Sequence, residues 1–270
     1  MILRHKMVLY ATYGLLFPVL FVFVCGCSSV VTQGGSEPRY TYHEFDGIMV
    51  FYRTHDVARY RALLPTVFEM PEEPLLMAYV IDFYKMDKAT QPYVEAAIFL
   101  LAHYNGKPAW HCITMPVTSN EARLGGIYYL GYPKIMGDIS LTRGPSTYTG
   151  QLKLMGKTVM TITHDVKDHS ITDEEKQWFQ RLKGIPSLNI LNGEIYQPKF
   201  GRGSGERTLL EIAETYPDKF QLKVGTSELL LDPEAAGGHS ERLGRIFSIK
   251  PTDIVLAYYF KNKFVTRFER

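Results

Sequence analysis

The segment "YVEAAIFLLAHYNGKPAWHCITMPV" (93–117) predicts a β-hairpin and decides the fold class. Asn105-Gly106 is a preferred pair for a tight hairpin turn, because both central residues of such a turn need positive φ. Residues 97–102, which precede the turn, are apolar on both faces of the expected strand. A strand that is apolar on both faces is covered on both sides. The segment therefore predicts a buried strand inside a packed β-domain.

Strand patterns recur along most of the chain beyond this hairpin. They combine β-branched and aromatic residues with turn residues at their ends. They cover residues 47–54, 73–86, 147–165, 220–233 and 253–269, and the third contains a hairpin turn near Gly156-Lys157. Since these segments dominate the pattern, we expect a mainly β domain over residues 39–270. The expected architecture is an antiparallel β-barrel with a few short helices.

Helical spacing is found in two short segments only. Residues 57–64 have apolar residues on one helical face and end at Pro65. Residues 173–182 begin with acidic residues, which favour the first turn of a helix. Residues 199–217 are predicted to form a loop that leads into a strand.

Composition excludes some classes of function. The chain has 270 residues, 46% of them hydrophobic, with a net charge of +2 from 30 basic and 28 acidic residues. No cluster of Lys and Arg stands out, so we expect no nucleic-acid partner. His103 and His111 lie on the hairpin strands, but neither has a second ligand at metal spacing, so both are interpreted as structural and no metal is expected.

The N-terminus has the pattern of an export signal. Basic residues are followed by the apolar run 7–24 and by Cys25-Gly26-Cys27, which resembles a bacterial lipobox. We expect residues 1–27 to be a signal peptide or membrane anchor, with lipidation at Cys27, and residues 28–38 to be a flexible tether. This predicts an exported, membrane-anchored protein at the outer membrane or the periplasmic face. An uncleaved anchor is the alternative, because the run is nearly long enough to span a bilayer.

Two charged residues stand in apolar surroundings. Lys134 lies in "LGYPKIMGDISL" (130–141), and Glu95 interrupts the apolar run of the first hairpin. On the residues alone, Lys134 is an exposed lysine after a proline turn or a lysine that is held dry for function. Glu95 is a solvated strand end or a carboxylate that is paired in the interior, since an unpaired one costs free energy there.

The segment around Lys134 resembles the aromatic-Pro-Lys-Lys segment of the acetoacetate decarboxylase superfamily. Residues 49–65 ("MVFYRTHDVARYRALLP") and 92–98 ("PYVEAAI") resemble two further segments of that family, and Glu95 and Lys134 are separated like the family's carboxylate and lysine. The resemblance implies a β-barrel, a buried lysine that forms a Schiff base with a keto acid, and often a homo-oligomer. It implies no metal and no organic cofactor.

The sequence departs from the family pattern at several positions. Ile135 replaces the second lysine, Phe45 stands where the family has an arginine, and residues 126–128 (Gly-Ile-Tyr) replace a Gly-Arg-Glu. Tyr79 aligns with a second glutamate of the family. The site thus keeps its amine and one carboxylate and loses other charges.

The resemblance implies that Lys134 is the nucleophile and that Glu95 assists it, while Tyr79, Tyr128 and Tyr132 bind the substrate. Only a neutral amine attacks a carbonyl, and burial or a neighbouring cation favours that form of a lysine. Because the second lysine is missing, we expect desolvation by Tyr132, Ile135 and Met136 to supply the effect.

Two functional hypotheses follow. The first is a Schiff-base-forming lyase that acts on a small keto acid, with decarboxylation of a β-keto acid such as acetoacetate as the default and aldol or dehydration chemistry as a variant. The second is a membrane-tethered lipoprotein that binds an apolar or carbonyl ligand in the barrel without turnover. The lost charges favour the second hypothesis, and the retained Lys134 and Glu95 favour the first.

Overall fold

The computed structural model describes residues 40–87, 91–198 and 207–268. These residues belong to one compact unit. The expected signal segment, Cys27 and the tether lie outside the described residues. No helix in the described ranges is long and apolar enough to cross a membrane.

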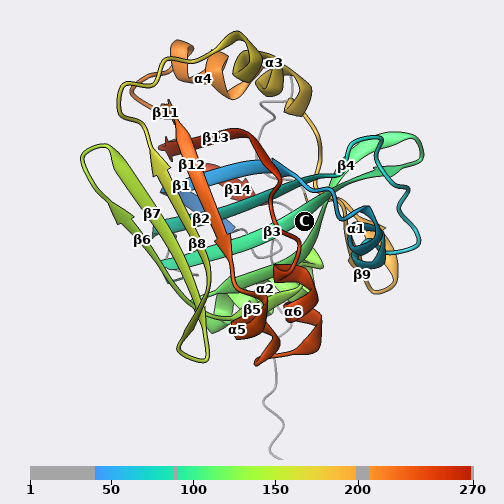
Figure 1. Cartoon of the computed structure of the whole chain (residues 1–270). Coiled ribbons are helices and arrows are strands. Elements are labelled where there is room, and N and C mark those ends of the chain that lie inside the picture. Colours follow the sequence, from blue (N-terminus) through green and yellow to red (C-terminus); the bar gives the residue numbers. More distant parts are fainter. Residues whose placement is uncertain (1–39, 88–90, 199–206, 269–270) are drawn as a thin grey trace, which may run out of the picture. The chain divides into compact units, whose positions relative to one another are not determined.

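A large sheet carries most of the strands and positions the site (Figure 1). Its order is β11-β13-β1-β2-β3-β4-β5, and β14 also pairs with β1. The bounds are β1 (Tyr40–Arg53), β2 (Leu75–Met86), β3 (Tyr93–Tyr104), β4 (Lys107–Val117), β5 (Lys134–Met136), β11 (Phe220–Val224), β13 (Asp253–Asn262) and β14 (Thr266–Phe268). All of these pairings are antiparallel except that of β4 with β5, which is parallel.

A smaller sheet has the order β12-β8-β7-β6, and β9 pairs with β10 separately. The bounds are β6 (Asp138–Arg143), β7 (Thr147–Leu154), β8 (Lys157–Asp165), β9 (Asn189–Leu191), β10 (Glu194–Tyr196) and β12 (Thr226–Leu231). Both sheets are open across the described ranges, so the mainly β prediction is confirmed but a closed barrel is not found. The chain passes from one sheet to the other at Gly137 and at Gly225, and there the strand ladder breaks.

The large sheet is covered on both faces, as the apolar pattern of the first hairpin predicts. Strand β2 shows the division, because successive side chains of a strand point to opposite faces. Leu76, Ala78 and Val80 belong to one core, and Met77, Tyr79 and Ile81 belong to the other. The first core includes residues of the smaller sheet. Gly150 of β7 lies so close to Val80 that a Cβ added to Gly150 would be 2.7 Å from the Val80 side chain. The second core contains the candidate site.

The hairpin predictions are confirmed in detail. Asn105 and Gly106 have φ values of 52° and 71°, and they join β3 to β4. The second hairpin turns at Met155 and Gly156, one residue earlier than expected. Two predicted single segments are each divided: 220–233 into β11 and β12, and 253–269 into β13 and β14.

The helices are α1 (Val57–Leu63), α2 (Asn120–Leu130), α3 (Asp173–Leu182), α4 (Leu209–Thr215), α5 (Pro233–Gly237) and α6 (Glu241–Phe247). Helices α1 and α3 confirm the two predicted segments. Helix α4 corrects the prediction of a loop over 199–217, since a capping box between Thr208 and Glu211 starts a helix there. Helices α2, α5 and α6 were not expected, and α2 leads directly to Lys134.

Candidate active site

The end of helix α2 sets the position of Lys134. The helix begins at the N-cap Ser119 and ends at Gly131, which adopts a left-handed conformation with φ of 67°. Such a conformation favours glycine. Tyr132 and Pro133 follow, and Lys134 opens the short strand β5 beside Met115 of β4.

Lys134 is buried, at 7% exposed. Its aliphatic stem passes over Gly126 of α2, where a Cβ would overlap its Cδ and Cε atoms. The expected desolvation by Ile135 and Met136 is corrected here, because Ile135 is half-buried and Met136 is 44% exposed. Successive residues of a strand point to opposite faces, so Ile135 packs against the first core and does not share the surroundings of Lys134.

Glu95 is the partner of Lys134. Its Oε2 atom lies 2.6 Å from Nζ of Lys134, and Glu95 is 5% exposed. Glu95 lies on the face of β3 that also carries Ala97 and Phe99, which belong to the second core. A buried carboxylate is tolerated when it is paired and hydrogen-bonded, and Glu95 meets both conditions.

Two tyrosines orient this carboxylate. The hydroxyl of Tyr79 donates to Oε1 of Glu95 at 2.6 Å, and that of Tyr93 reaches Oε2 at 3.5 Å. Burial, with a further contribution from the Glu95 carboxylate, raises the pKa of Tyr79 and of Tyr93 well above the usual tyrosine value. Both phenols therefore stay protonated at neutral pH and act as donors. The Tyr93 ring also lies 5.3 Å from Nζ of Lys134.

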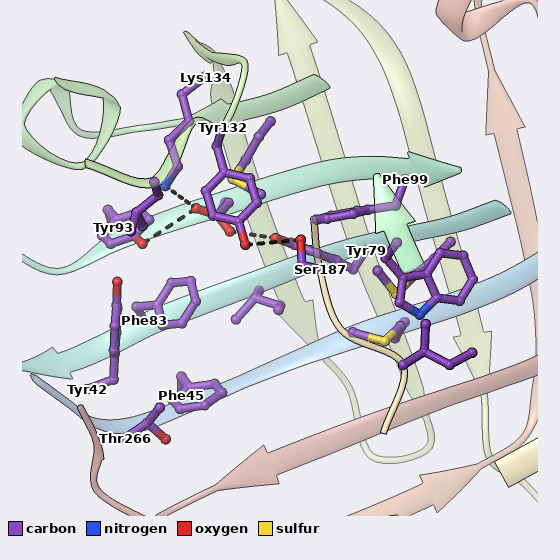
Figure 2. A pocket seen from close by; sticks show the side chains of 18 residues that line it. Tyr42, Phe45, Tyr79, Phe83, Tyr93, Phe99, Tyr132, Lys134, Ser187 and Thr266 are labelled. Atoms are coloured by element: carbon purple, nitrogen blue, oxygen red, sulfur yellow. Dashed lines mark hydrogen bonds and ion pairs between the residues drawn. The ribbon is translucent and has the colours of Figure 1, made fainter. Parts of the chain in front are cut away.

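The pair faces a cavity of about 360 Å³ (Figure 2). Most of its lining is aromatic or aliphatic, and it includes Tyr79, Tyr132 and Phe45 of the residues that sequence analysis singled out. The Tyr132 hydroxyl lies 3.5 Å from Oγ of Ser187, and burial raises the pKa of Tyr132. The structure thus brings together Lys134, Glu95, Tyr79 and Tyr132.

Tyr128 does not join this group. It is 66% exposed on α2 and is not among the residues that line the cavity. Its position outside the cavity lining has a geometric reason. Gly126 faces Lys134, and a residue two positions further along an α-helix points about 200° away.

Sequence reasoning missed Tyr93 and Ser187. Tyr93 precedes Glu95 by two positions on β3, and the period of a strand therefore places both on one face. That signal was present in "PYVEAAI". Ser187 lies between α3 and β9 and forms an isolated β-bridge with Trp110. No local sequence pattern indicates that Ser187 belongs to the site. No group of three metal-ligating side chains gathers in the described ranges.

The family follows from the sequence as a whole. The model of the acetoacetate decarboxylase (ADC) family matches residues 30–267. The chain belongs to this family. An acetoacetate decarboxylase of Burkholderia mallei is 25% identical over 202 residues, which cover 73% of this chain and 75% of the relative. The same figures hold for an acetoacetate decarboxylase of Burkholderia pseudomallei.

Solved structures share the fold at lower identity. The acetoacetate decarboxylase of Legionella pneumophila has a TM-score of 0.63 at 16% identity and covers 86% of this chain and 85% of its own. An acetoacetate decarboxylase-like enzyme of Sphingomonas wittichii has a TM-score of 0.59 at 17% identity, covering 87% and 92%. The enduracididine biosynthesis enzyme MppR, complexed with pyruvate, has a TM-score of 0.61 at 15% identity, covering 92% and 93%.

Proposed function

We propose that this protein is a Schiff-base-forming lyase that decarboxylates a β-keto acid, with Lys134 as nucleophile and Glu95 as its proton partner. The observation that carries the proposal is the buried contact of 2.6 Å between Nζ of Lys134 and Oε2 of Glu95. The pair lies at the wall of a cavity with room for a ligand. Membership of the acetoacetate decarboxylase family supports the reaction class.

The first chemical step is formation of the imine. An amine attacks a carbonyl only without its extra proton, and Oε2 of Glu95 lies at hydrogen-bond distance to accept that proton. Nζ then bonds to the ketone carbon, and loss of water leaves a protonated imine. The proton on Glu95 can go to the departing oxygen. Tyr79 holds the other carboxylate oxygen, so Oε2 stays directed at the amine.

The second step releases carbon dioxide. The bond between the α-carbon and the carboxylate breaks, and its electron pair moves to the imine nitrogen and gives an enamine. The apolar walls favour this step, because a carboxylate loses hydration among them whereas carbon dioxide is neutral. A proton then adds to the α-carbon, and water hydrolyses the imine to a methyl ketone and the free amine.

Trapping of the imine tests the proposal. The domain from residue 28 onward is incubated with acetoacetate and, separately, with pyruvate, and borohydride is added to reduce any imine to a stable amine. We expect a mass adduct that maps to Lys134 and release of carbon dioxide from acetoacetate. Lys134→Ala should abolish both signals.

Lys223→Ala is the control: the Nζ of Lys223 is also hydrogen-bonded to a side chain, the Tyr148 hydroxyl, but Lys223 is exposed and does not line the cavity. This variant should form the adduct like the unaltered protein. If no adduct forms from about pH 6 to 9, where a buried lysine has become neutral in other proteins, the lyase proposal fails. A ligand-binding protein without turnover is then the better account.

Aldol or dehydration chemistry through the same imine is the second candidate. Support comes from MppR, which has this fold and has been solved with the condensation product of pyruvate and imidazole 4-carboxaldehyde. Adduct formation with pyruvate, without carbon dioxide release from acetoacetate, would favour this candidate.

We also propose that the domain is tethered to a membrane through Cys27. The support is the sequence alone: the basic start, the apolar run 7–24 and the lipobox-like Cys25-Gly26-Cys27. Labelling with a fatty acid should mark the full chain and should fail for Cys27→Ser. Labelling of that variant would contradict the proposal.

A further inference from the structure

The cavity beside Lys134 is larger than a very small keto acid such as acetoacetate requires. Its volume of about 360 Å³ lies in the range of pockets that enclose drug-sized ligands, roughly 300–1,000 Å³. The reactive pair occupies one part of the lining. The remaining walls therefore enclose space for a part of the substrate that does not react.

One of these walls is a continuous run of aromatic rings. It begins with Tyr93, whose ring is 5.3 Å from Nζ of Lys134. The Phe83 ring is 4.9 Å from Tyr93, and the rings of Tyr42 and Phe45 are 4.9 and 5.2 Å from Phe83. Figure 2 shows Phe83, Tyr42 and Phe45 below Tyr93 in the view. The run thus leads from the amine across strands β3, β2 and β1.

Further apolar side chains line the cavity in addition to this run. They include Met49, Met77, Phe99 and Trp110. Methionine side chains adapt their shape to an apolar ligand because they are unbranched and flexible. Tyr79 and Tyr93, which reach Glu95, are the polar side chains at the reaction centre. Tyr42 and Thr266 add two hydroxyls beside Phe45 at the far end of the run (Figure 2).

We propose that the natural substrate is a β-keto acid with a bulky apolar acyl group, which lies along the aromatic run from Tyr93 to Phe45. This inference rests on the proposed function, because it assigns the substrate class of the same site. The reaction is the one given above: the α-carbon to carboxylate bond breaks, carbon dioxide leaves, and a proton and water complete a long-chain or aryl methyl ketone. No co-reactant beyond water and a proton is required.

Burial of the acyl group provides the selectivity. Each methylene moved from water into an apolar site contributes about fourfold in an equilibrium or rate ratio. Acetoacetate has only a methyl group at this position and leaves most of the aromatic run without contact. A longer acyl chain gains with each carbon until the cavity is filled.

A series of substrates tests the inference in the unaltered protein. Carbon dioxide release is measured with acetoacetate, 3-oxohexanoate, 3-oxooctanoate, 3-oxodecanoate and benzoylacetate. We expect kcat/KM to rise about fourfold per methylene over the first members and benzoylacetate to exceed acetoacetate. Among the product ketones, 2-heptanone should inhibit more strongly than acetone. If acetoacetate is turned over as well as 3-oxooctanoate, the inference is overturned.

Phe45→Ala adds a structural test. Phe45 is half-buried at the end of the aromatic run, and the truncation should reduce the preference for 3-oxooctanoate over acetoacetate by about tenfold. Phe264→Ala is the matched control: Phe264 is also half-buried and packs on Tyr216, but it does not line the cavity. This variant should keep the unaltered preference. An unchanged preference in Phe45→Ala contradicts the assigned wall.

Borohydride trapping distinguishes failure of the substrate class from failure of the proposed lyase function. Adducts on Lys134 with all acids, but without a gain from chain length, overturn the substrate class and leave the lyase proposal standing. Absence of both adduct and carbon dioxide with every acid overturns the proposed function and this inference with it.

Discussion

Gly126 of α2 and Lys134 of β5 share a space that holds only one side chain. A Cβ on Gly126 would overlap Cδ and Cε of Lys134 and would lie 3.1 Å from its Cγ. The absence of a side chain at position 126 thus allows the lysine stem to lie flat on the helix and Nζ to reach Glu95. The geometry of the reactive pair depends on this glycine.

Gly126→Ala should displace Lys134 without unfolding the protein. The lysine stem is flexible and can move aside, so the stability cost is small. The amine then no longer points at Glu95, and a misplacement of about 1 Å can cost about 100-fold in rate. The rate of borohydride-trapped adduct formation measures the effect, and the thermal unfolding midpoint monitors stability.

Gly237→Ala is the matched control for this glycine. Gly237 also lies in a helix, α5, but the nearest atom to a Cβ there is 3.8 Å away, which is an ordinary contact. Its trapping rate should equal that of the unaltered protein. An unimpaired Gly126→Ala variant would show that the lysine does not need this space.

Glu95→Gln tests the proton transfer. The amide matches the carboxylate in shape, but its single oxygen replaces only one of the two acceptors that Tyr79 and Lys134 use, and it cannot take a proton from the amine. General acid–base groups typically contribute about 10²–10⁴-fold, so imine formation should slow by at least about 100-fold. Glu73→Gln is the control, because Glu73 is ion-paired with Arg53 and Arg181 and does not line the cavity. Equal rates for both variants would remove Glu95 from the mechanism.

Local sequence signals predicted the elements whose determinants are local. The β3–β4 turn follows from Asn105-Gly106, and α3 follows from its acidic first turn, where Thr172 and Glu175 form a capping box. Helix α2 has a comparable start at Ser119. However, the glycine pair at 125–126 disfavours a helix interior by roughly 1 kcal/mol per residue. The reason for Gly126 is tertiary, because a side chain there would overlap Lys134.

The arrangement of the sheets and the site depended on long-range contacts. Strand propensity indicates β structure, but it does not say whether the strands between β5 and β11 close a barrel or form a second open sheet. Similarly, the pattern around Lys134 alone favoured an exposed lysine, and only the family resemblance predicted its burial. Glu95, which lies far along the chain, supplies the contact that explains it.

Tyr79→Phe tests whether this hydroxyl positions the carboxylate. The variant keeps the ring and the cavity shape but removes the donor to Oε1 of Glu95. Hydrogen bonds to charged groups contribute roughly 1.5–3 kcal/mol, so we expect kcat to fall by about 10- to 100-fold while KM changes little. Tyr128→Phe, which removes an exposed hydroxyl on α2, should be neutral. A rise in KM alone would instead indicate that Tyr79 binds the substrate directly.

Stability should decline in mild acid because the fold buries His164 in its neutral form. His164 is fully buried, its Nδ1 lies 2.8 Å from Oγ of Ser227, and its Nε2 lies 3.0 Å from the carbonyl oxygen of Lys223. Burial lowers its pKa below the usual value of 6.5, against the opposing effect of the hydrogen bond to the Lys223 carbonyl. The unfolded chain therefore takes up a proton near pH 6.5 that the folded state does not.

The free energy of unfolding should accordingly decrease as the pH falls from 7 to 5, and the loss should level off below the folded-state pKa. The slope is at most about 1.4 kcal/mol per pH unit for one histidine. Burial also lowers the pKa of His111, which adds to the slope. Urea unfolding at several pH values measures it. His164→Gln should flatten the slope, whereas His239→Gln, at an exposed position, should keep it. If His164→Gln retains the full slope, other groups cause the acid sensitivity.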